Sequence, residues 1–267
     1  MPKPSAIAIG AHPDDIEFCM AGTLLQLKAV GWTIHYFNLS SGNLGSVKMS
    51  SAKTTRTRAK EARAAAKTLG AKYHPSVCDD LEIMYDVPTL RKVSAVIRES
   101  KASIVLTHSP VDYMEDHTNT CRLAVTAAFT HGMPNFKSTP ATKSYRQNVT
   151  VYHGMPHSLR DPLRKCVTPG AFVNTTDVHQ KKIEALAAHE SQQDWLDVSQ
   201  GMNSYLTAAD DMSRMVGRLA KKFKHAEGWR RHLHYGFSSK EEDPLKEALG
   251  KRYLVNQQYE RLLEKGN

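Results

Sequence analysis

Apolar and polar segments alternate along the first half of the chain in the order strand, helix, strand, helix. Four short apolar or β-branched runs predict buried strands at 5–11, 33–39, 72–77 and 103–107. Apolar positions at helical spacing predict helices over 16–30, 52–69, 89–99 and from about 117 to 132. This alternation favours a Rossmann-like, doubly wound, mostly parallel α/β sheet with right-handed crossovers.

The second half has a less regular pattern and predicts an elaborated C-terminal part. Strands are expected at 148–153 and 172–175, and helices at about 177–191, 208–222 and 244–264. The irregular segment 154–162 is expected to close over a crevice. We predict a single domain over 1–267, with a core at about 5–200 and a helical extension at about 205–267.

An acidic motif, AHPDDIE, occupies residues 11–17, where the first predicted strand gives way to a helix. Its carboxylates and its imidazole lie so close together that a cation among them relieves their repulsion. Helix capping, the alternative interpretation, accounts for one carboxylate but not for two carboxylates preceded by a histidine. The motif therefore predicts a bound metal ion with His12 and Asp15 as ligands.

A second polar segment, residues 107–117, follows another predicted strand and contains His117. The carboxyl ends of strands in an open α/β sheet face one crevice, so distant segments can meet there. His117 then completes a set of three ligands and leaves a fourth position for water, as in a catalytic zinc site. Asp14 is the candidate general base, and Asp116 is expected to cap the helix that begins near His117.

These residues resemble the zinc-dependent PIG-L/LmbE-like family, which includes N-acetylglucosaminyl-phosphatidylinositol deacetylase and its bacterial relatives. The first motif and the pair Asp116-His117 carry most of the resemblance. Further stretches that carry it are 22–24, 58–62, 69–70, 182–192 and 226–229. The similarity covers roughly residues 5–237, and only the first motif is highly specific.

The resemblance implies metal binding by His12, Asp15 and His117. It also implies a general base in Asp14, a catalytic carboxylate in Asp116 and a substrate contact for Arg58. The cofactor is expected to be Zn²⁺, with another divalent metal as the alternative.

One position departs from the family, which commonly has a histidine three residues before the last ligand. This chain has Met114 there, and a thioether donates neither a hydrogen bond nor a proton. Loss of one oxyanion donor typically costs roughly 100-fold or more in rate. His108 and His153 are the candidate replacements, and we assign His108, together with Arg58, to substrate binding.

Charge and cysteine content indicate which classes of protein the chain does not resemble. The chain has 36 Lys and Arg against 27 Asp and Glu, but no nucleic-acid motif accompanies the net charge of +9. A solvated basic surface is therefore favoured over nucleic-acid binding. The four cysteines lack CxxC spacing, and no signal region or apolar span is present. We expect a cytoplasmic protein without a membrane anchor, and a homo-oligomer by analogy only.

The expected function is hydrolysis of an acetamide by a metal-dependent N-deacetylase. The resemblance implies an N-acetylated small molecule as substrate, in the class of N-acetylglucosamine conjugates. Two alternatives stay open: a metal-dependent phosphoester hydrolase, and a metal- and sugar-binding homologue without turnover, which would explain Met114. A dinucleotide-binding oxidoreductase is disfavoured because the first turn lacks GxGxxG and its carboxylates would repel pyrophosphate.

Overall fold

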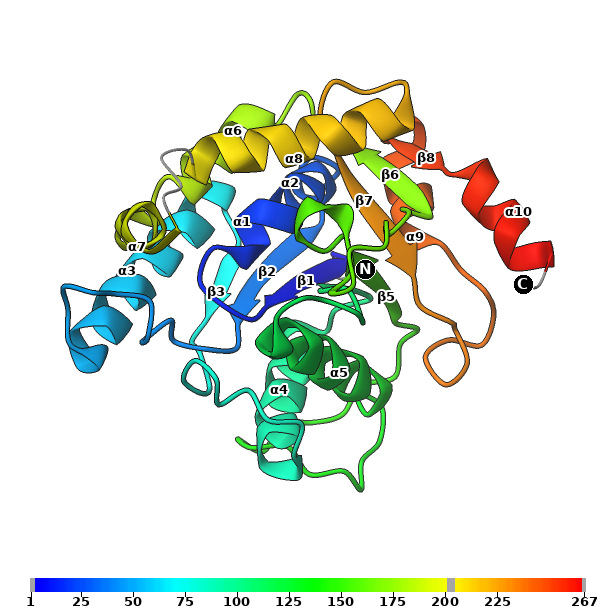
Figure 1. Ribbon diagram of the computed structural model, residues 1–267. Coiled ribbons are helices and arrows are strands. Elements are labelled where there is room, and N and C mark those ends of the chain that lie inside the picture. Colours follow the sequence, from blue (N-terminus) through cyan, green and yellow to red (C-terminus); the bar gives the residue numbers. More distant parts are fainter. Residues whose placement is uncertain (1–2, 201–204, 266–267) are drawn as a thin grey trace.

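In the part of the chain that the structure describes, eight strands form one sheet, and the first five in spatial order run parallel (Figure 1). The computed structural model describes residues 3–200 and 205–265. Across the sheet the strands are β3 (Lys72–His74), β2 (Thr33–Asn38), β1 (Ser5–Gly10), β4 (Ile104–Thr107), β5 (Thr150–Gly154), β7 (Ala226–Arg231), β6 (Ala171–Asn174) and β8 (Tyr253–Val255). The last three strands attach by antiparallel pairing. The predicted Rossmann-like α/β fold with an elaborated C-terminal part is confirmed.

Helices cover both faces of the sheet, with α4 and α5 on one face and α2, α3 and α6 on the other (Figure 1). Helix α8 packs against the C-terminal strands through a separate cluster that contains Phe172. The bounds of the helices are α1 (Asp15–Cys19), α2 (Ala21–Ala29), α3 (Ser51–Leu69), α4 (Val87–Ser100), α5 (Glu115–Phe129), α6 (His179–Leu186), α7 (Glu190–Gln200), α8 (Tyr205–Ala220), α9 (Pro244–Leu249) and α10 (Gln257–Lys265). Two 3₁₀ turns span His157–Leu159 and Gly250–Arg252. Within the described ranges, none of these helices combines the length and the apolar content that crossing a bilayer requires.

The central strand β1 shows why two helical layers are needed. Ala6 and Ala8 are in the hydrophobic cluster that contains α2 and α3 residues. Ile7 and Ile9 are in the cluster that contains α4 and α5 residues. Because successive side chains of a strand point to opposite faces, both faces of this strand are buried.

The carboxyl ends of the parallel strands lie in register. Gly10 at the end of β1 pairs with Asn38 of β2, and Ile9 pairs with Thr107 of β4. The order β3-β2-β1-β4-β5 places a change in winding direction between β1 and β4. Ligands of open α/β sheets bind at such a position, so residues 11–17 and 108–117 emerge there side by side.

The predicted helix over 16–30 is two helices, α1 and α2, which meet at Met20. The buried carboxylate of Glu227 accepts the backbone N–H groups of Gly22 and Thr23, at 2.8 and 2.7 Å. This carboxylate satisfies amides that a new helix start leaves open, and its charge suits the helix dipole. The separation of α1 from α2 is therefore stabilised by Glu227, a residue far along the chain.

Three predicted helix features in the second half of the chain and at α5 differ from the structure. The helix predicted over 244–264 is wrong, because α9 ends at Leu249 and the chain then forms β8, which pairs with β6, before α10 begins. The helix predicted over 177–191 divides into α6 and α7. The predicted capping of α5 by Asp116 is also wrong, since α5 begins at Glu115 with Met114 at the N-cap position.

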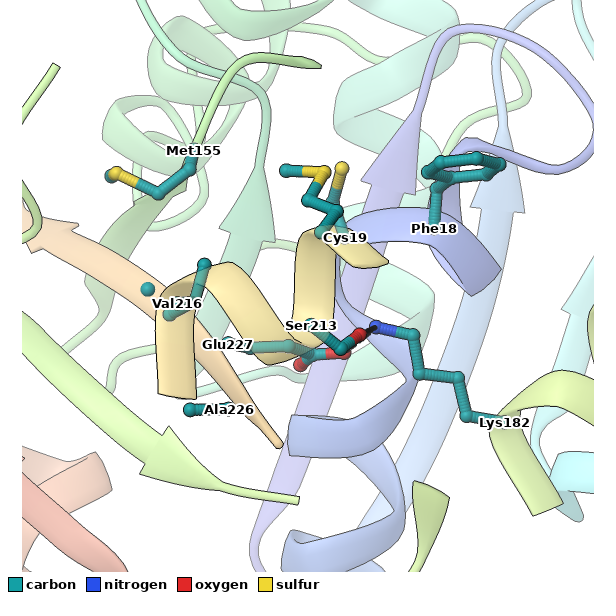
Figure 2. A pocket seen from close by; sticks show the side chains of 10 residues that line it. Phe18, Cys19, Met155, Lys182, Ser213, Val216, Ala226 and Glu227 are labelled. Carbon is teal, nitrogen blue, oxygen red and sulfur yellow. Dashed lines mark hydrogen bonds and ion pairs between the residues drawn. The ribbon is translucent and has the colours of Figure 1, made fainter. Parts of the chain in front are cut away.

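A buried ion pair joins α6 to β7 behind the first helix. Lys182 Nζ lies 2.8 Å from Glu227 Oε1 and donates to Ser213 Oγ at 3.3 Å. Figure 2 shows this cluster beside a small cavity of about 10 Å³ that Phe18 and Cys19 also line. Lys182 is 1% exposed, so its charge depends on Glu227 for compensation.

Replacing Lys182 by Met is expected to lower the free energy of unfolding by about 3–5 kcal/mol, because Glu227 would keep a buried charge without its cation. Chemical denaturation measures the change. Lys181→Met, which removes the same charge from an exposed neighbour on α6, is the control and should cost under about 0.5 kcal/mol. A Lys182→Met variant as stable as this control would contradict the interpretation.

Candidate metal centre

The two acidic segments converge at the ends of β1 and β4. His117 Nε2 lies 3.3 Å from one carboxylate oxygen of Asp15, and His12 Nδ1 lies 3.5 Å from the other. A tetrahedral zinc ion with ligand bonds near 2.0–2.2 Å holds its ligand atoms about 3.3 Å apart. The structure therefore brings together the three residues that the sequence singled out, at a spacing that suits one ion.

A tight turn after β1 presents these side chains. The backbone N–H of His12 donates to Asp15 Oδ2 at 2.7 Å, and the N–H of Asp15 donates to the carbonyl of His12. Asp14, between them, has a φ of 118°, a conformation that costs a residue with a side chain of order 1–3 kcal/mol. The turn thus directs Asp14 and Asp15 differently, at the cost of local strain.

Each imidazole of the centre has a carboxylate on its outer ring nitrogen. His12 Nε2 lies 3.0 Å from Asp116 Oδ2, which also accepts the backbone N–H of Leu81. His117 Nδ1 lies 3.0 Å from Asp112 Oδ1. Metal-binding histidines typically pair their second nitrogen with a carboxylate, which fixes the ring and its tautomer. His12 Nδ1 and His117 Nε2 are left to face Asp15, where both could bind the same metal ion.

The charges of the centre favour a cation. Burial acts to lower the pKa of His12, but Asp116 and Asp15 raise it to about 9. Burial acts in the same direction on His117, yet Asp15 and Asp112 raise its pKa to about 10. For Asp15, burial acts to raise the pKa, and the adjacent His117 and His108 hold it well below its usual value. The carboxylates thus draw positive charge onto the two rings, and a divalent ion would supply that charge directly.

Asp14 has a different environment from Asp15. Its Oδ2 accepts the hydroxyl of Tyr205 at 2.6 Å, and the Arg58 guanidinium lies 3.9 Å from its Oδ1. Burial, followed by the negative charge of Asp15, raises the pKa of Asp14 above its usual range. A carboxylate with a raised pKa is better matched to accepting a proton near neutral pH.

Arg58 of α3, predicted as a substrate contact, is buried beneath the loops that contain Pro13 and Gly42. Its guanidinium is 2% exposed and donates to the carbonyls of Pro13 and Gly42, at 2.7 and 3.1 Å. Gly42 has a φ of +73°, and a Cβ there would lie 2.6 Å from the Arg58 side chain. In this structure Arg58 therefore organises the turn that carries Asp14.

His108 lies in the centre, whereas His153 lies behind it. The His108 ring stacks on His117 with centroids 4.1 Å apart, and its Nε2 lies 3.2 Å from Asp15 and 2.9 Å from the backbone N–H of Ala11. His153 instead contacts the carbonyl of His108 and pairs with His232 at 2.9 Å. Burial lowers the pKa of both imidazoles, which keeps them neutral.

Four residues of the surroundings were not found from the sequence: Asp112, Tyr113, His157 and Tyr205. Asp112 lies within the second polar segment, so its proximity to His117 was available as a signal. Tyr113 is 58% exposed, with its ring edge-on to His117 and to His157. Tyr205 reaches Asp14 across 191 residues, a contact that no local pattern announces.

Comparison with known proteins shows which family the chain resembles. The family model of PIG-L, described as GlcNAc-PI de-N-acetylase, matches residues 7–129. A diacetylchitobiose deacetylase of Thermococcus kodakarensis is 28% identical over 192 residues, which are 70% of this chain and 69% of the relative. A 4-oxalmesaconate hydratase of Pseudomonas putida is 29% identical over 200 residues, or 72% and 75%.

A solved structure gives the same fold over most of the chain. The 4-carboxy-2-hydroxymuconate hydratase GalB of Pseudomonas putida superposes with a TM-score of 0.73 at 24% identity, covering 90% of this chain and 99% of its own. At that identity the likeness shows the fold alone. Together with the family match, the predicted resemblance to PIG-L/LmbE-like de-N-acetylases is confirmed.

Proposed function

We propose that this chain, which resembles PIG-L/LmbE-like de-N-acetylases and matches their family model over residues 7–129, is a hydrolase that removes an acetyl group from an N-acetylated sugar conjugate with the help of one Zn²⁺ ion. The observation that carries the proposal is the centre formed by His12, Asp15 and His117, in which both rings have a carboxylate on the outer nitrogen. The relative that acts on diacetylchitobiose supports the sugar class.

The donor set fits a zinc ion, with His12 Nδ1, His117 Nε2 and an oxygen of Asp15 as its ligands. When bound, the ion would supply a Lewis acid for the acetamide carbonyl and would acidify water. Asp14 accepts a proton from the attacking water, because its raised pKa suits this transfer. The same group, once protonated, can return the proton to the leaving amine.

The remaining residues act by position. Tyr205 and Arg58 hold Asp14, the first through a hydrogen bond and the second through its charge and its contact with the carbonyl of Pro13. Asp116, expected as a catalytic carboxylate, acts through His12 in this proposal, because its oxygen is already engaged by that ring. His108 lies beside Asp15 and His117, where a substrate carbonyl would approach, and we keep it as a substrate contact.

Replacing Met114 by His is expected to raise kcat for acetate release by roughly 10- to 100-fold, because an imidazole can donate to the oxyanion or to the leaving amine. The matched control is Met133→His, which adds the same ring at another partly exposed methionine, remote in sequence from the motifs. Steady-state kinetics on one N-acetylglucosamine conjugate compares the two variants. An unchanged kcat in Met114→His would show that the absent histidine does not limit the rate.

Water addition to a carbon–carbon double bond is a second candidate, favoured by two observations. The hydratase relative is 29% identical to this chain, against 28% for the deacetylase, and this chain has Met114 in place of the histidine expected to assist a leaving amine. Hydration has no leaving amine and so does not need that acid. Asp14 would again be the base.

Parallel assays distinguish the two reactions. The protein loaded with Zn²⁺ is incubated with a panel of N-acetylglucosamine conjugates, with acetate measured, and with unsaturated dicarboxylates, with loss of ultraviolet absorbance measured. Acetate release that is absent in Asp14→Asn supports the proposal. Hydration of the unsaturated acids without acetate release would replace deacetylation by the second candidate.

A further inference from the structure

A second group of two imidazoles and one carboxylate lies outside the centre described above. Its members are His179, the first residue of α6, Asp210 of α8, and His225, which directly precedes β7. Both histidines are buried, at 7% and 4% exposure. The residues come from three separate segments, so only tertiary packing brings them together.

The two histidines of this triad approach the same carboxylate oxygen. His179 Nε2 lies 2.8 Å and His225 Nε2 lies 3.1 Å from the same oxygen, Asp210 Oδ1. The two rings stack with centroids 3.8 Å apart and planes within 3° of parallel. Tetrahedral zinc keeps its ligand atoms about 3.3 Å apart, so to hold an ion the two Nε2–Oδ1 distances lengthen by a few tenths of an ångström. The stacked rings also tilt, so that the in-plane lone pair of each Nε2 meets the same ion.

The contacts of Asp210 leave Oδ1 as the oxygen that both histidines approach. Arg214, one turn along α8, engages the other oxygen, Oδ2, and so fixes the rotation of the carboxylate. The Asp210 side chain is 29% exposed, which leaves a route for an ion and a position for water. Arg214 is 42% exposed, so solvent screens its positive charge.

The imidazoles have no competing partner on their other nitrogen. Nδ1 of His179 and Nδ1 of His225 are buried without a hydrogen-bond partner among residues 3–200 and 205–265. Every polar contact of the two rings is therefore directed through Nε2 toward Asp210. The carboxylate oxygen accepts both rings in this structure, and a shared ion would replace these two hydrogen bonds by bonds to both rings and to the carboxylate. Unlike those of the first centre, these rings have no carboxylate on the outer nitrogen.

The triad also lies next to the buried ion pair shown in Figure 2. His179 precedes Lys182 by three residues on α6, and Asp210 precedes Ser213 by three residues on α8, so each pair shares a helix face. Lys182 and Ser213 are in contact. Like the ion pair, the triad connects α6 and α8 to the segment of β7. It does so through residues that lie about one turn earlier on each helix.

We propose that His179, Asp210 and His225 bind a second divalent transition-metal ion of the zinc class, which ties α6 and α8 to β7. The donor set, two imidazoles and one carboxylate, is the same as that of the first centre. Imidazole and carboxylate ligands suit zinc in preference to calcium or magnesium. The role of this ion is stabilisation of the C-terminal packing, independent of the reaction at the first centre.

The test measures metal content and thermal stability of the full-length, tag-free protein after equilibration with Zn²⁺ and removal of excess. The parent protein is expected to hold two ions per chain, and Asp210→Asn one. Asparagine keeps a hydrogen-bond acceptor for the histidines, so the variant retains the neutral contacts while it loses the anionic ligand. Asp211→Asn, a neighbour with an exposed side chain, is the matched control and should keep both ions.

Thermal unfolding provides a second measurement. Added Zn²⁺ should raise the Tm of His117→Ala, which keeps only the second site, and should fail to raise the Tm of the double variant His117→Ala, Asp210→Asn. If Asp210→Asn binds as much zinc as Asp211→Asn, the second site does not exist. If the parent holds one ion that Asp210→Asn removes and His117→Ala keeps, the second site is supported and the first is contradicted.

Discussion

Replacing Asp14 by Asn is expected to lower kcat for acetate release by about 10²- to 10⁴-fold, the usual contribution of a general base. Asparagine keeps the shape of the side chain and an acceptor for the Tyr205 hydroxyl, but it cannot take a proton at neutral pH. Because Asp14 is not one of the three proposed ligands, metal content should stay at the parent level. Steady-state kinetics and metal analysis of the same preparation give both values.

The control for this variant is Glu115→Gln. Glu115 is exposed, lies in the first turn of α5, and has no place in the proposed mechanism. Its replacement changes the net charge by the same amount and should leave kcat within about twofold of the parent. If Asp14→Asn retained full activity, the assignment of the base would be wrong.

Replacing His117 by Ala is expected to remove both the ion of the first centre and the reaction. The variant loses one of three ligands and leaves Asp112 without the ring that it orients. The rate should therefore fall further than in Asp14→Asn, to the level of the uncatalysed reaction, because Asp14 then has no activated water to deprotonate. Metal analysis should find one ion fewer per chain than in the parent.

A histidine that belongs to neither proposed ligand set tests whether the loss is specific. His234 is partly exposed, and its ring packs against Tyr235. His234→Ala should keep the parent metal content and activity. Retention of the first ion and of acetate release in His117→Ala would remove His117 from the site.

The parallel half of the sheet was predictable because its strands carry their own signal. Apolar runs ending in glycine or polar residues, as at Ile7–Gly10, are buried on both faces and need no distant partner to be identified. The strand β7, by contrast, has the sequence AEGWRR, in which charged residues interrupt any apolar pattern. Its strand conformation comes from pairing with β5 and β6, which local sequence does not encode.

In the candidate site, the approach of the two motifs could be predicted from the sequence, whereas several side-chain contacts could not. The meeting of His12 with His117 follows from the rule that parallel strands end at one edge, and the structure brings these rings to 5.5 Å between centroids. For Asp116 the sequence predicts a helix cap and the family resemblance implies catalysis, whereas its contact with His12 spans 104 residues and has no local signal. The burial of Arg58 follows from the loop that passes over it, a tertiary feature that helix α3 alone does not reveal.

The most direct test of the account is anomalous X-ray scattering, at the zinc edge, from crystals equilibrated with Zn²⁺. We predict a peak at the ends of β1 and β4, about 2.0–2.2 Å from His12 Nδ1, His117 Nε2 and an oxygen of Asp15. The outer nitrogens of both rings should still face Asp116 and Asp112. A crystal saturated with zinc elsewhere, but without a peak between these three side chains, would contradict it.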